Sequence, residues 1–234
     1  MAIPAISVII PTYNEEQNIQ SVIEKTKAAD HCEVIVVDGG STDQTIAKAK
    51  HADIVIESKL GRAVQQNAGA NQATGEILLF LHADCELLPE FANAVEECLS
   101  KKGVVAGCFR QLIDHPAKKY RTIEKGNAWR VRNLGWIYGD QGLFLKREIF
   151  EQLGGFPEMP LMEDLYFSKR LKKEGKLIVS DHCIKVSARR WEKNGVIRQT
   201  ARNWGFVTLA HLGVKPETLA SWYGHVREAD VTPS

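Results

Sequence analysis

The stretch with the clearest capacity for chemistry is a run of five apolar residues, 77–81, that is followed by His82, Ala83 and Asp84. Such a run without glycine or proline is typical of a strand buried on both faces. An imidazole and a carboxylate at the end of a buried strand are costly to desolvate unless they have partners. Because side chains alternate along a strand, His82 and Asp84 fall on the same side. The pattern fits a hard-cation site at Asp84, and it fits equally a solvated turn after a core strand.

Polar side chains also follow two other predicted strands, at residues 5–10 and 33–37. Tyr13 and Glu15 come after the first of these strands, and Asp38 comes directly after the second. Parallel strands joined by helices bring their carboxyl ends to one edge of the sheet, where open α/β folds bind ligands. Three strand ends that deliver carboxylates to one edge favour a nucleotide or metal site over three independent solvated turns.

The elements that must position these residues alternate between strand and helix through the first hundred residues. Strands are expected at 5–10, 33–37, 53–57 and 77–81, with helices between them, including one at 61–73, and another after Pro89. Asn14 with Gln17, and Ser41 with Gln44, have the spacing of capping boxes that would open two of these helices. This alternation predicts an α/β fold with a Rossmann-like, mostly parallel sheet flanked by helices.

The second half of the chain is expected to contribute further strands and helices to the same domain. The expected strands lie at 104–112, 143–145, and in a short pair at 176–180 and 183–187, and the expected helices lie at 163–174, 194–212 and from Pro216 onward. The basic segment 116–133 carries interleaved Tyr120 and Trp129. It fits a charged solvated face, and the alternative is a surface for an anionic or lipid-linked ligand.

Composition limits the classes of function that remain open. The net charge of +1 gives no bulk attraction to nucleic acid, so no nucleic-acid partner is expected. The five cysteines contain no C-x-x-C pair, which argues against a zinc cluster or a disulfide framework and favours reduced thiols in a cytoplasmic setting. We expect no signal peptide and no transmembrane segment, because no apolar run approaches the ~20 residues that a membrane span needs.

Phosphates, if they are bound, must be held by something other than a glycine-rich loop. The chain has neither a P-loop pattern nor a G-x-G-x-x-G after its first strand, which disfavours nucleoside-triphosphatase and dinucleotide folds. A bound cation and Arg62 are the remaining candidates, since arginine offers a forked set of donors to phosphate oxygens. A solvated helix start is the alternative interpretation of Arg62.

Eight segments in order resemble the family two glycosyltransferases, which have the GT-A fold. They are residues 8–16, 36–45, 61–69, 80–84, 139–142, 154–157, 161–165 and 187–191. The His-Ala-Asp sequence at 82–84 and the Arg-Arg-Trp ending at 189–191 resemble the subgroup of radical-SAM and selenodomain-associated glycosyltransferases. The resemblance covers a GT-A domain over 1–191. Helical periodicity predicts a C-terminal helical appendage over 192–228, and a disordered tail is expected over 229–234.

The resemblance implies a nucleotide-sugar donor, with a uridine-diphosphate sugar expected. In such a site Tyr13 would stack on the base and Asp38 would accept a hydrogen bond from its ring nitrogen. Pro11 and Glu15 would line the same pocket. Arg62 would approach the base or the diphosphate.

The resemblance also assigns the metal site and the catalytic base. The Asp-x-Asp motif of the family maps onto His82, Ala83 and Asp84, so Asp84 would meet a Mn²⁺ or Mg²⁺ ion. His82 departs from the motif, and an imidazole ligand would tilt the preference toward Mn²⁺. Asp164, beside Glu163, matches the base that takes a proton from the acceptor hydroxyl during an inverting displacement.

The roles of three further residues are less closely defined by the resemblance. Gln141 would bond sugar hydroxyls, or it is simply a polar strand start. Arg190 would contact the diphosphate, and Trp191 would wall the acceptor or pack under a loop. The tryptophan-bearing C-terminal helices would cover the core, pair two subunits, or contact the inner face of a membrane.

Two rival functions use a similar nucleotide-binding sheet. A nucleotidyltransferase that makes an activated sugar usually carries a glycine-rich basic loop after its first strand, which the segment 11–14 is not. A non-catalytic nucleotide-sugar sensor needs Tyr13 and Asp38 but no base, and the pair Glu163 and Asp164 speaks against it. An inverting, metal-dependent glycosyltransferase with a hydroxyl acceptor, either lipid-linked or a small molecule, is therefore the leading hypothesis.

Overall fold

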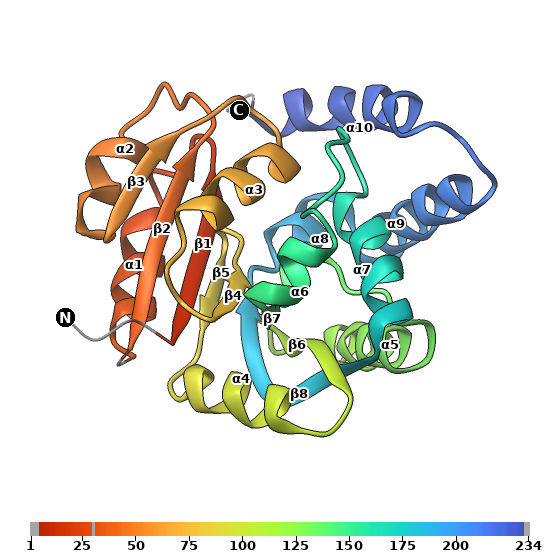
Figure 1. Cartoon of the computed structure of the whole chain (residues 1–234). Helices are drawn as coiled ribbons and strands as arrows, with labels where there is room; N and C mark the ends of the chain where they lie inside the picture. Colours follow the sequence, from red (N-terminus) through yellow and green to blue (C-terminus); the bar gives the residue numbers. More distant parts are fainter. Residues whose placement is uncertain (1–4, 30, 232–234) are drawn as a thin grey trace.

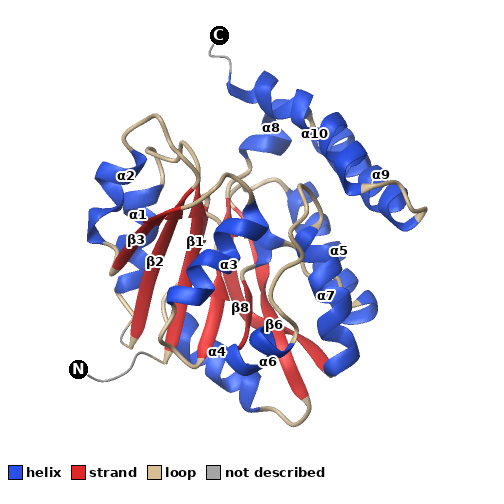
Figure 2. Ribbon diagram, turned by 45° about the horizontal axis from the view of Figure 1, so that its top comes forward, coloured by secondary structure: helices blue, strands red, loops and turns tan. Residues whose placement is uncertain are grey.

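A mixed sheet with helices on both faces forms the body of the protein in the computed structural model (Figure 1, Figure 2). The structure describes residues 5–29 and 31–231, with the side chains of Arg190 and of 224–231 excepted. Over these residues, eight strands are arranged in the order β3-β2-β1-β4-β7-β6-β8-β5. No helix of this part of the chain is both long enough and apolar enough to cross a membrane.

The first half of the sheet is parallel, as the sequence predicts. Its strands and helices, in chain order, are β1 (Ile6–Thr12), α1 (Ile19–Lys27), β2 (Cys32–Asp38), α2 (Thr45–Lys48), η1 (Ala49–His51), β3 (Ile54–Glu57), α3 (Arg62–Gln72) and β4 (Ile77–Phe80). β1 pairs in parallel with both β2 and β4, and β2 pairs in parallel with β3. The carboxyl ends of β1, β2 and β4 therefore lie along one edge.

The second half adds antiparallel pairing, which makes the sheet mixed. Its elements are β5 (Cys85–Leu87), α4 (Phe91–Ser100), β6 (Val104–Ile113), α5 (Lys118–Leu134), η2 (Gly139–Gln141), β7 (Leu143–Lys146), α6 (Arg147–Gln152), α7 (Glu163–Glu174), β8 (Lys176–Val186), α8 (Arg189–Asn194), α9 (Val196–His211) and α10 (Pro216–Val231). β7 runs antiparallel to β4 and β6, and β5 runs antiparallel to β8. The helices α8 and α10 lie beyond the ends of the strands (Figure 2).

The expected pair of short strands at 176–180 and 183–187 is wrong. The segment forms one strand, β8, which pairs in parallel with β6. The register shifts where Cys108 faces Val179 and Arg110 faces Cys183, so β8 accommodates extra residues at that point. Asp181 and His182 lie in this irregular stretch and are exposed. Their polarity interrupts the apolar pattern without ending the strand.

The two expected capping boxes are also wrong, because tertiary contacts use their side chains elsewhere. α1 begins only at Ile19, and Asn14 adopts a left-handed backbone with φ of 53°. The Oδ1 atom of Asn14 accepts a hydrogen bond from the backbone N–H of Thr42. Ser41 donates to Asp38 instead of capping a helix. The predicted tail at 229–234 overlaps the end of α10, and residues 232–234 lie outside the described residues.

Alternate residues of each central strand face two different hydrophobic layers. Val8 and Ile10 of β1 pack in the layer covered by α1 and α4, while Ile9 packs in the layer covered by α3, α6 and α7. The second layer contains a cluster of aromatic rings in which Phe80 of β4 contacts Phe150 and Phe156, at centroid distances of 5.3 and 4.8 Å. These contacts fix the end of β4, and with it the position of the residues that follow.

The packing of α3 on the sheet gives a first prediction about stability. A β-carbon on Gly69 would lie 2.5 Å from Cγ2 of Ile9 and 2.9 Å from Cγ2 of Val37. We expect Gly69→Ala to lower the free energy of unfolding by about 1–3 kcal/mol, because overpacking forces the helix away from the strands. Urea denaturation measures this change. Arg62 begins the same helix, so the contact also sets its position.

Gly126 provides the matched control for this substitution. It lies within α5, and a β-carbon built on it meets nothing within 4 Å. We expect Gly126→Ala to leave stability unchanged or to raise it by up to ~1 kcal/mol, since alanine favours helix more than glycine does. Equal losses of stability in the two variants would contradict the assignment of the effect to contacts with Ile9 and Val37.

Candidate active site

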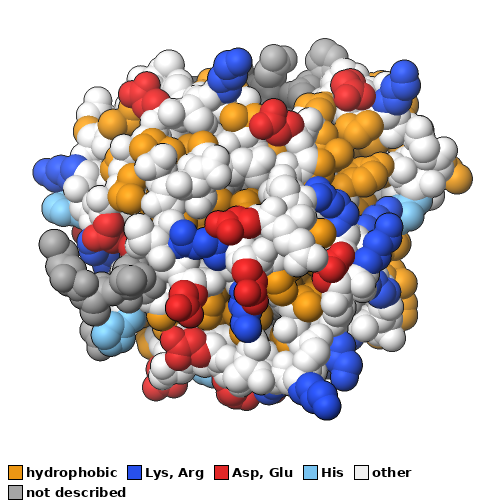
Figure 3. Space-filling view, in the orientation of Figure 1, with side chains coloured by type: hydrophobic (Ala, Val, Ile, Leu, Met, Phe, Trp, Pro, Cys, Tyr) orange, Lys and Arg blue, Asp and Glu red, His pale blue; other side chains and the backbone are white. Residues whose placement is uncertain are grey.

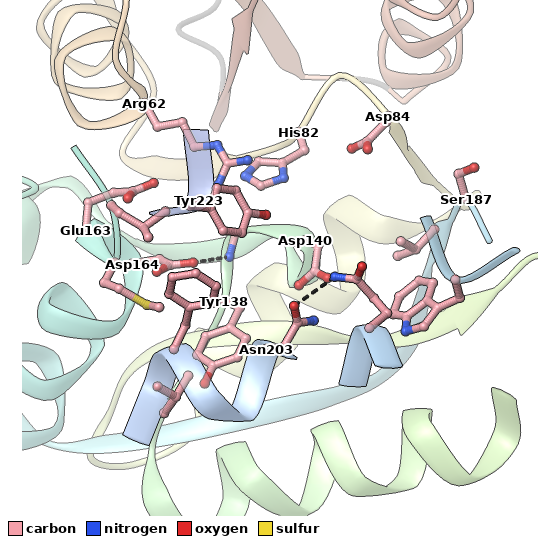
Figure 4. A pocket seen from close by; sticks show the side chains of 18 of the residues that line it. Arg62, His82, Asp84, Tyr138, Asp140, Glu163, Asp164, Ser187, Asn203 and Tyr223 are labelled. Atoms are coloured by element: carbon pink, nitrogen blue, oxygen red, sulfur yellow. Dashed lines mark hydrogen bonds between the residues drawn. The ribbon is translucent and has the colours of Figure 1, made fainter. Parts of the chain in front are cut away.

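A cavity of about 140 Å³ lies where the ends of the central strands meet the second half of the chain (Figure 4). Its walls come from the start of α3, the loop after β4, the segment leading into η2, the start of α7, the end of β8 and the helices α8 to α10. Asp84 and Asp164, 80 positions apart in the chain, both line it. The structure thus brings the predicted metal ligand and the predicted base to one shared space.

Two backbone N–H groups fix the carboxylate of Asp164. Its Oδ2 accepts a hydrogen bond of 2.8 Å from Gly139, and its Oδ1 accepts one of 2.7 Å from Leu165 in the first turn of α7. The residue before the helix, Met162, has a left-handed backbone with φ of 70°, which turns the chain into α7. Glu163 is buried, with 3% of its surface exposed, and also lines the cavity.

Gly139 connects the two sides of this cavity. Its N–H donates to Asp164, while its own Cα packs directly against the imidazole of His82. A β-carbon at this position would lie 2.3 Å from Nε2 of His82. Only glycine permits this approach, so the position of the Asp164 carboxylate and that of the His82 imidazole depend on each other.

Arg62 and His82 form the upper wall of the cavity as drawn in Figure 4. The guanidinium of Arg62 lies beside the imidazole ring and faces the interior, together with the ring of Tyr223 from α10 (Figure 4). Asp84 faces the same interior from the other end of the loop. Ala83, between the two predicted ligands, is buried and does not reach the cavity surface.

The protein groups near Asp84 suit a divalent ion that shares its coordination with a substrate. Among the described residues, no group of three or more His, Cys, Asp or Glu side chains is placed to hold a metal by itself. Mg²⁺ and similar ions are commonly bound through one or two carboxylates together with substrate phosphates and water. Asp84 on the cavity wall, with Arg62 nearby for phosphate oxygens, fits that type of site.

The opposite wall is built on a buried arginine. The guanidinium of Arg130 stacks on the ring of Tyr138 at 3.5 Å, and its Nη2 donates a bond of 2.6 Å to Oε1 of Gln141. Burial raises the pKa of Tyr138 to about 12, so its hydroxyl stays protonated and neutral. Gln141 is fully buried and does not line the cavity. Its observed position is therefore that of a residue supporting the wall.

The predicted base-binding residues lie at the ends of β1 and β2, outside the lining of this cavity. Tyr13 is 45% exposed, so a face of its ring is open to a ligand. Asp38 is fully buried, and its oxygens accept hydrogen bonds from Thr12, Gly40 and Ser41. In this arrangement Asp38 orders the 39–41 loop, and a direct bond to a base stays a prediction.

Pro11 and Glu15 also flank this end of the sheet. Pro11 lies within β1, half-buried, and Glu15 accepts a hydrogen bond of 2.8 Å from the side-chain amide of Asn18. Neither residue lines the 140 Å³ cavity. Their predicted place in a base pocket remains a prediction.

Residues 189–191, at the end of the last matching segment, contribute Arg189 and Trp191 to the lining of the cavity. Trp191 is buried, packs edge-on against Tyr120 at 6.4 Å, and also lines the cavity. Its contact with an acceptor stays a prediction. The side chain of Arg190 lies outside the described residues, and its neighbour Arg189 lines the cavity instead. Arg189 belongs to the same basic motif, whose arginines are expected to contact the diphosphate.

The helices α9 and α10 cover the cavity, which sequence reasoning did not predict. Asn203 and Phe206 of α9 and Tyr223 of α10 line it, and the rings of Phe206 and Tyr223 meet edge-on at 5.5 Å. Amphipathic periodicity shows that these helices have a buried face, but it carries no signal about what that face covers.

Known proteins similar to this chain share both the family and the fold. Residues 7–155 match the glycosyl transferase family 2 profile, which is more than half of the 234-residue chain. Glycosyltransferase AglE of Haloferax volcanii is 28% identical over 78% of this chain and 66% of its own length. An undecaprenyl-phosphate 4-deoxy-4-formamido-L-arabinose transferase of Serratia proteamaculans is 35% identical over 64% of this chain and 52% of its own length. The chain thus spans about half to two thirds of these curated relatives.

Solved structures agree with the fold. The mannosyltransferase PcManGT from Pyrobaculum calidifontis, in complex with GDP-Man and Mn²⁺, superposes with a TM-score of 0.63 and 26% identity, over 79% of this chain and 57% of that one. S. aureus TarS in complex with UDP superposes with a TM-score of 0.62 and 21% identity, over 78% and 60% of the two chains, which bears on the fold alone. The mixed sheet flanked by helices is that of the GT-A glycosyltransferases. The chain belongs to glycosyl transferase family 2.

Proposed function

We propose that this protein transfers a sugar, with inversion at the anomeric carbon, from a uridine-diphosphate sugar to a hydroxyl acceptor, and that it uses Mn²⁺ or Mg²⁺. The observation that carries the proposal is the shared cavity of Asp84 and Asp164, which come from different halves of the chain. Membership of the radical-SAM and selenodomain-associated subgroup is part of the same proposal, and it rests on the motifs at 82–84 and 189–191 alone.

The donor half of the site consists of groups suited to a nucleoside diphosphate. Tyr13 offers an exposed ring for stacking on the base, and Arg62 offers guanidinium donors to the diphosphate. Asp84, with His82 beside it, would hold the divalent ion. When bound, the ion neutralises the charge that develops on the leaving diphosphate.

The acceptor half of the site supplies the base. A sugar or lipid hydroxyl has too high a pKa to attack unaided, so a positioned carboxylate must take its proton as the new bond forms. Asp164 is oriented for this role by the N–H groups of Gly139 and Leu165. Attack on the face of the sugar opposite the diphosphate inverts the anomeric carbon. Trp191 and Tyr138 would wall the acceptor.

A thermal-shift panel tests the donor assignment. Uridine, guanosine and thymidine diphosphate sugars are added with Mn²⁺ or Mg²⁺, and a ligand that binds only the folded form raises the melting temperature. We expect the largest rise with a uridine-diphosphate sugar plus metal. A chain that responds only to nucleoside triphosphates and sugar phosphates would be a nucleotidyltransferase.

A product assay then separates catalysis from sensing. Release of free nucleoside diphosphate is measured with and without candidate hydroxyl acceptors, using the sugar identified by the panel. We expect release to rise when an acceptor is present. Tight donor binding without any release, across metals and acceptors, would indicate a non-catalytic sensor.

A further inference from the structure

Two neighbouring helices concentrate positive charge in a chain that is close to neutral. α5 carries six basic side chains and one acidic side chain, Glu124, which is buried and paired with Arg121 at 3.0 Å. α9 carries two arginines and no acidic residue. The whole chain has a net charge of only +1, so the rest of it is net negative. The excess of positive over negative charge therefore lies in these two helices.

The exposed face of α5 combines these charges with a tryptophan. Lys118, Lys125, Trp129 and Arg132 follow one another at intervals of seven, four and three residues, which places them on one side of the helix. Trp129 is 56% exposed. Among the described residues, the three basic side chains make no salt bridge with a carboxylate. Their charges are thus available to an external partner.

The exposed face of α9 carries an apolar stripe, beside which Arg198 is also exposed. Ile197, Trp204 and the adjoining Leu212 are 86%, 43% and 76% exposed, and Ala201 lies on the same stripe. A stripe of this kind on a surface helix leaves apolar area in contact with water. Basic side chains lie beside hydrophobic ones on the right-hand side of the space-filling view, where Figure 1 places α9 (Figure 3).

A narrow groove joins this region to the active site. It has a volume of about 50 Å³ and lies between Ile123 and Asn127 of α5 and Thr200 and Trp204 of α9. Its inner end shares Tyr138, Asp140, Trp191, Asn203 and Val207 with the cavity that contains Asp164. The groove therefore opens between the two helices, on the side of α5 that faces α9 rather than on the side that carries Lys118, Lys125 and Trp129.

We propose that the α5–α9 face, made of the exposed side chains Lys118, Lys125, Trp129, Arg132, Ile197, Trp204 and Leu212, docks on an anionic lipid bilayer. Lysine and arginine beside an anionic surface, tryptophan at the headgroup level and an apolar stripe at the acyl boundary are the parts of an interfacial binding site. A second copy of the chain fits less well, because a symmetric contact would oppose two faces of like charge.

Docking on a bilayer also indicates the class of acceptor, a hydroxyl carried by a membrane lipid or a lipid-linked glycan. Such a hydroxyl would be presented to the cavity that contains Asp164 from the side covered by α9. This acceptor assignment rests on the proposed transferase function, whereas the docking itself does not. The docking and the proposed transferase function are tested independently, because vesicle binding is measured without donor or metal.

Co-sedimentation with vesicles tests the docking. The full chain is mixed with phosphatidylcholine vesicles that contain or lack phosphatidylglycerol. We expect sedimentation with the anionic vesicles only, weakening as salt rises from 0.05 to about 0.5 M because salt screens the attraction. The triple variant K118E/K125E/R132E should bind at least tenfold more weakly, since each basic residue near an anionic surface contributes about fivefold.

The matched control carries the same change of charge elsewhere. Lys50, Lys59 and Lys102 are exposed and form no salt bridge among the described residues. The variant K50E/K59E/K102E should keep binding within about threefold of the unaltered chain. Equal loss in both variants, with both folded by thermal melting, would show attraction by bulk charge alone and overturn the proposal. Absence of sedimentation with anionic vesicles would overturn it as well.

Tryptophan fluorescence locates the contact. Lipids brominated on their acyl chains should quench the emission of the full chain, and W204F and W129F should each lose part of that quenching. Undiminished quenching in W129F/W204F would place the contact elsewhere and overturn the proposal. Sedimentation equilibrium without lipid provides the remaining check, because a dimer that W204F dissociates would assign this face to a second copy.

Discussion

Asp164→Asn is expected to lower kcat by about 10²–10⁴-fold and to leave the affinity for the donor close to that of the unaltered enzyme. The substitution keeps the size of the side chain and removes its ability to take a proton, and a loss of this size is typical of a missing general base. The groups proposed to bind the donor, such as Arg62, are other residues of the cavity wall and are unchanged in this variant. The measurement is nucleoside diphosphate release at saturating donor and acceptor, with donor affinity from titration.

Glu158→Gln provides the control for this prediction. Glu158 is an exposed carboxylate in the segment that leads into α7, and it does not line the cavity. We expect kcat to stay within twofold. The melting temperature of Asp164→Asn should stay within a few degrees, since the amide oxygen can still accept one of the two backbone bonds. Full turnover by a folded Asp164→Asn protein would remove Asp164 from the role of base.

The sequence predicts the central sheet well because its strands are continuous apolar runs. β1, β2 and β4 each lie within two residues of their expected ends, and their parallel pairing follows from the helices between them. β8 shows the limit of this reasoning. Periodicity has no way to distinguish the polar residues of a bulge from those of a turn, so Asp181 and His182 suggest a hairpin that is absent.

The site divides in a similar way between residues that a motif identifies and residues that only the fold can place. Asp84 and Asp164 are found by motif, and the fold brings them to one cavity. Asn203 and Tyr223 belong to no motif, and their position over the cavity depends on how α9 and α10 pack. Asp38 shows that a motif does not determine which groups a residue contacts. Its carboxylate accepts hydrogen bonds from the backbone N–H groups of Gly40 and Ser41 in the loop that follows it.

Gly139→Ala is the second substitution expected to have a large effect, of about 10²-fold on kcat. A β-carbon here would lie 2.3 Å from Nε2 and 2.7 Å from Cε1 of His82. Either the imidazole or the backbone must move, and movement of the backbone shifts the N–H that holds Asp164. A misplacement of about 1 Å in an active site can cost 10²-fold in rate. Steady-state kinetics should show the loss mainly in kcat. Gly126→Ala, which meets no neighbouring atom, should keep kcat within twofold.

A double variant identifies which movement causes the loss. In His82→Ala the ring that the new methyl group would strike is gone, so adding Gly139→Ala to that background should cost less than threefold. Such strong non-additivity is expected of residues in direct contact. If Gly139→Ala costs the same 10²-fold with and without the imidazole, the clash with His82 is not the cause. In that case the backbone conformation alone requires glycine at position 139. The contact between Gly139 and His82 then does not couple the position of His82 to that of Asp164.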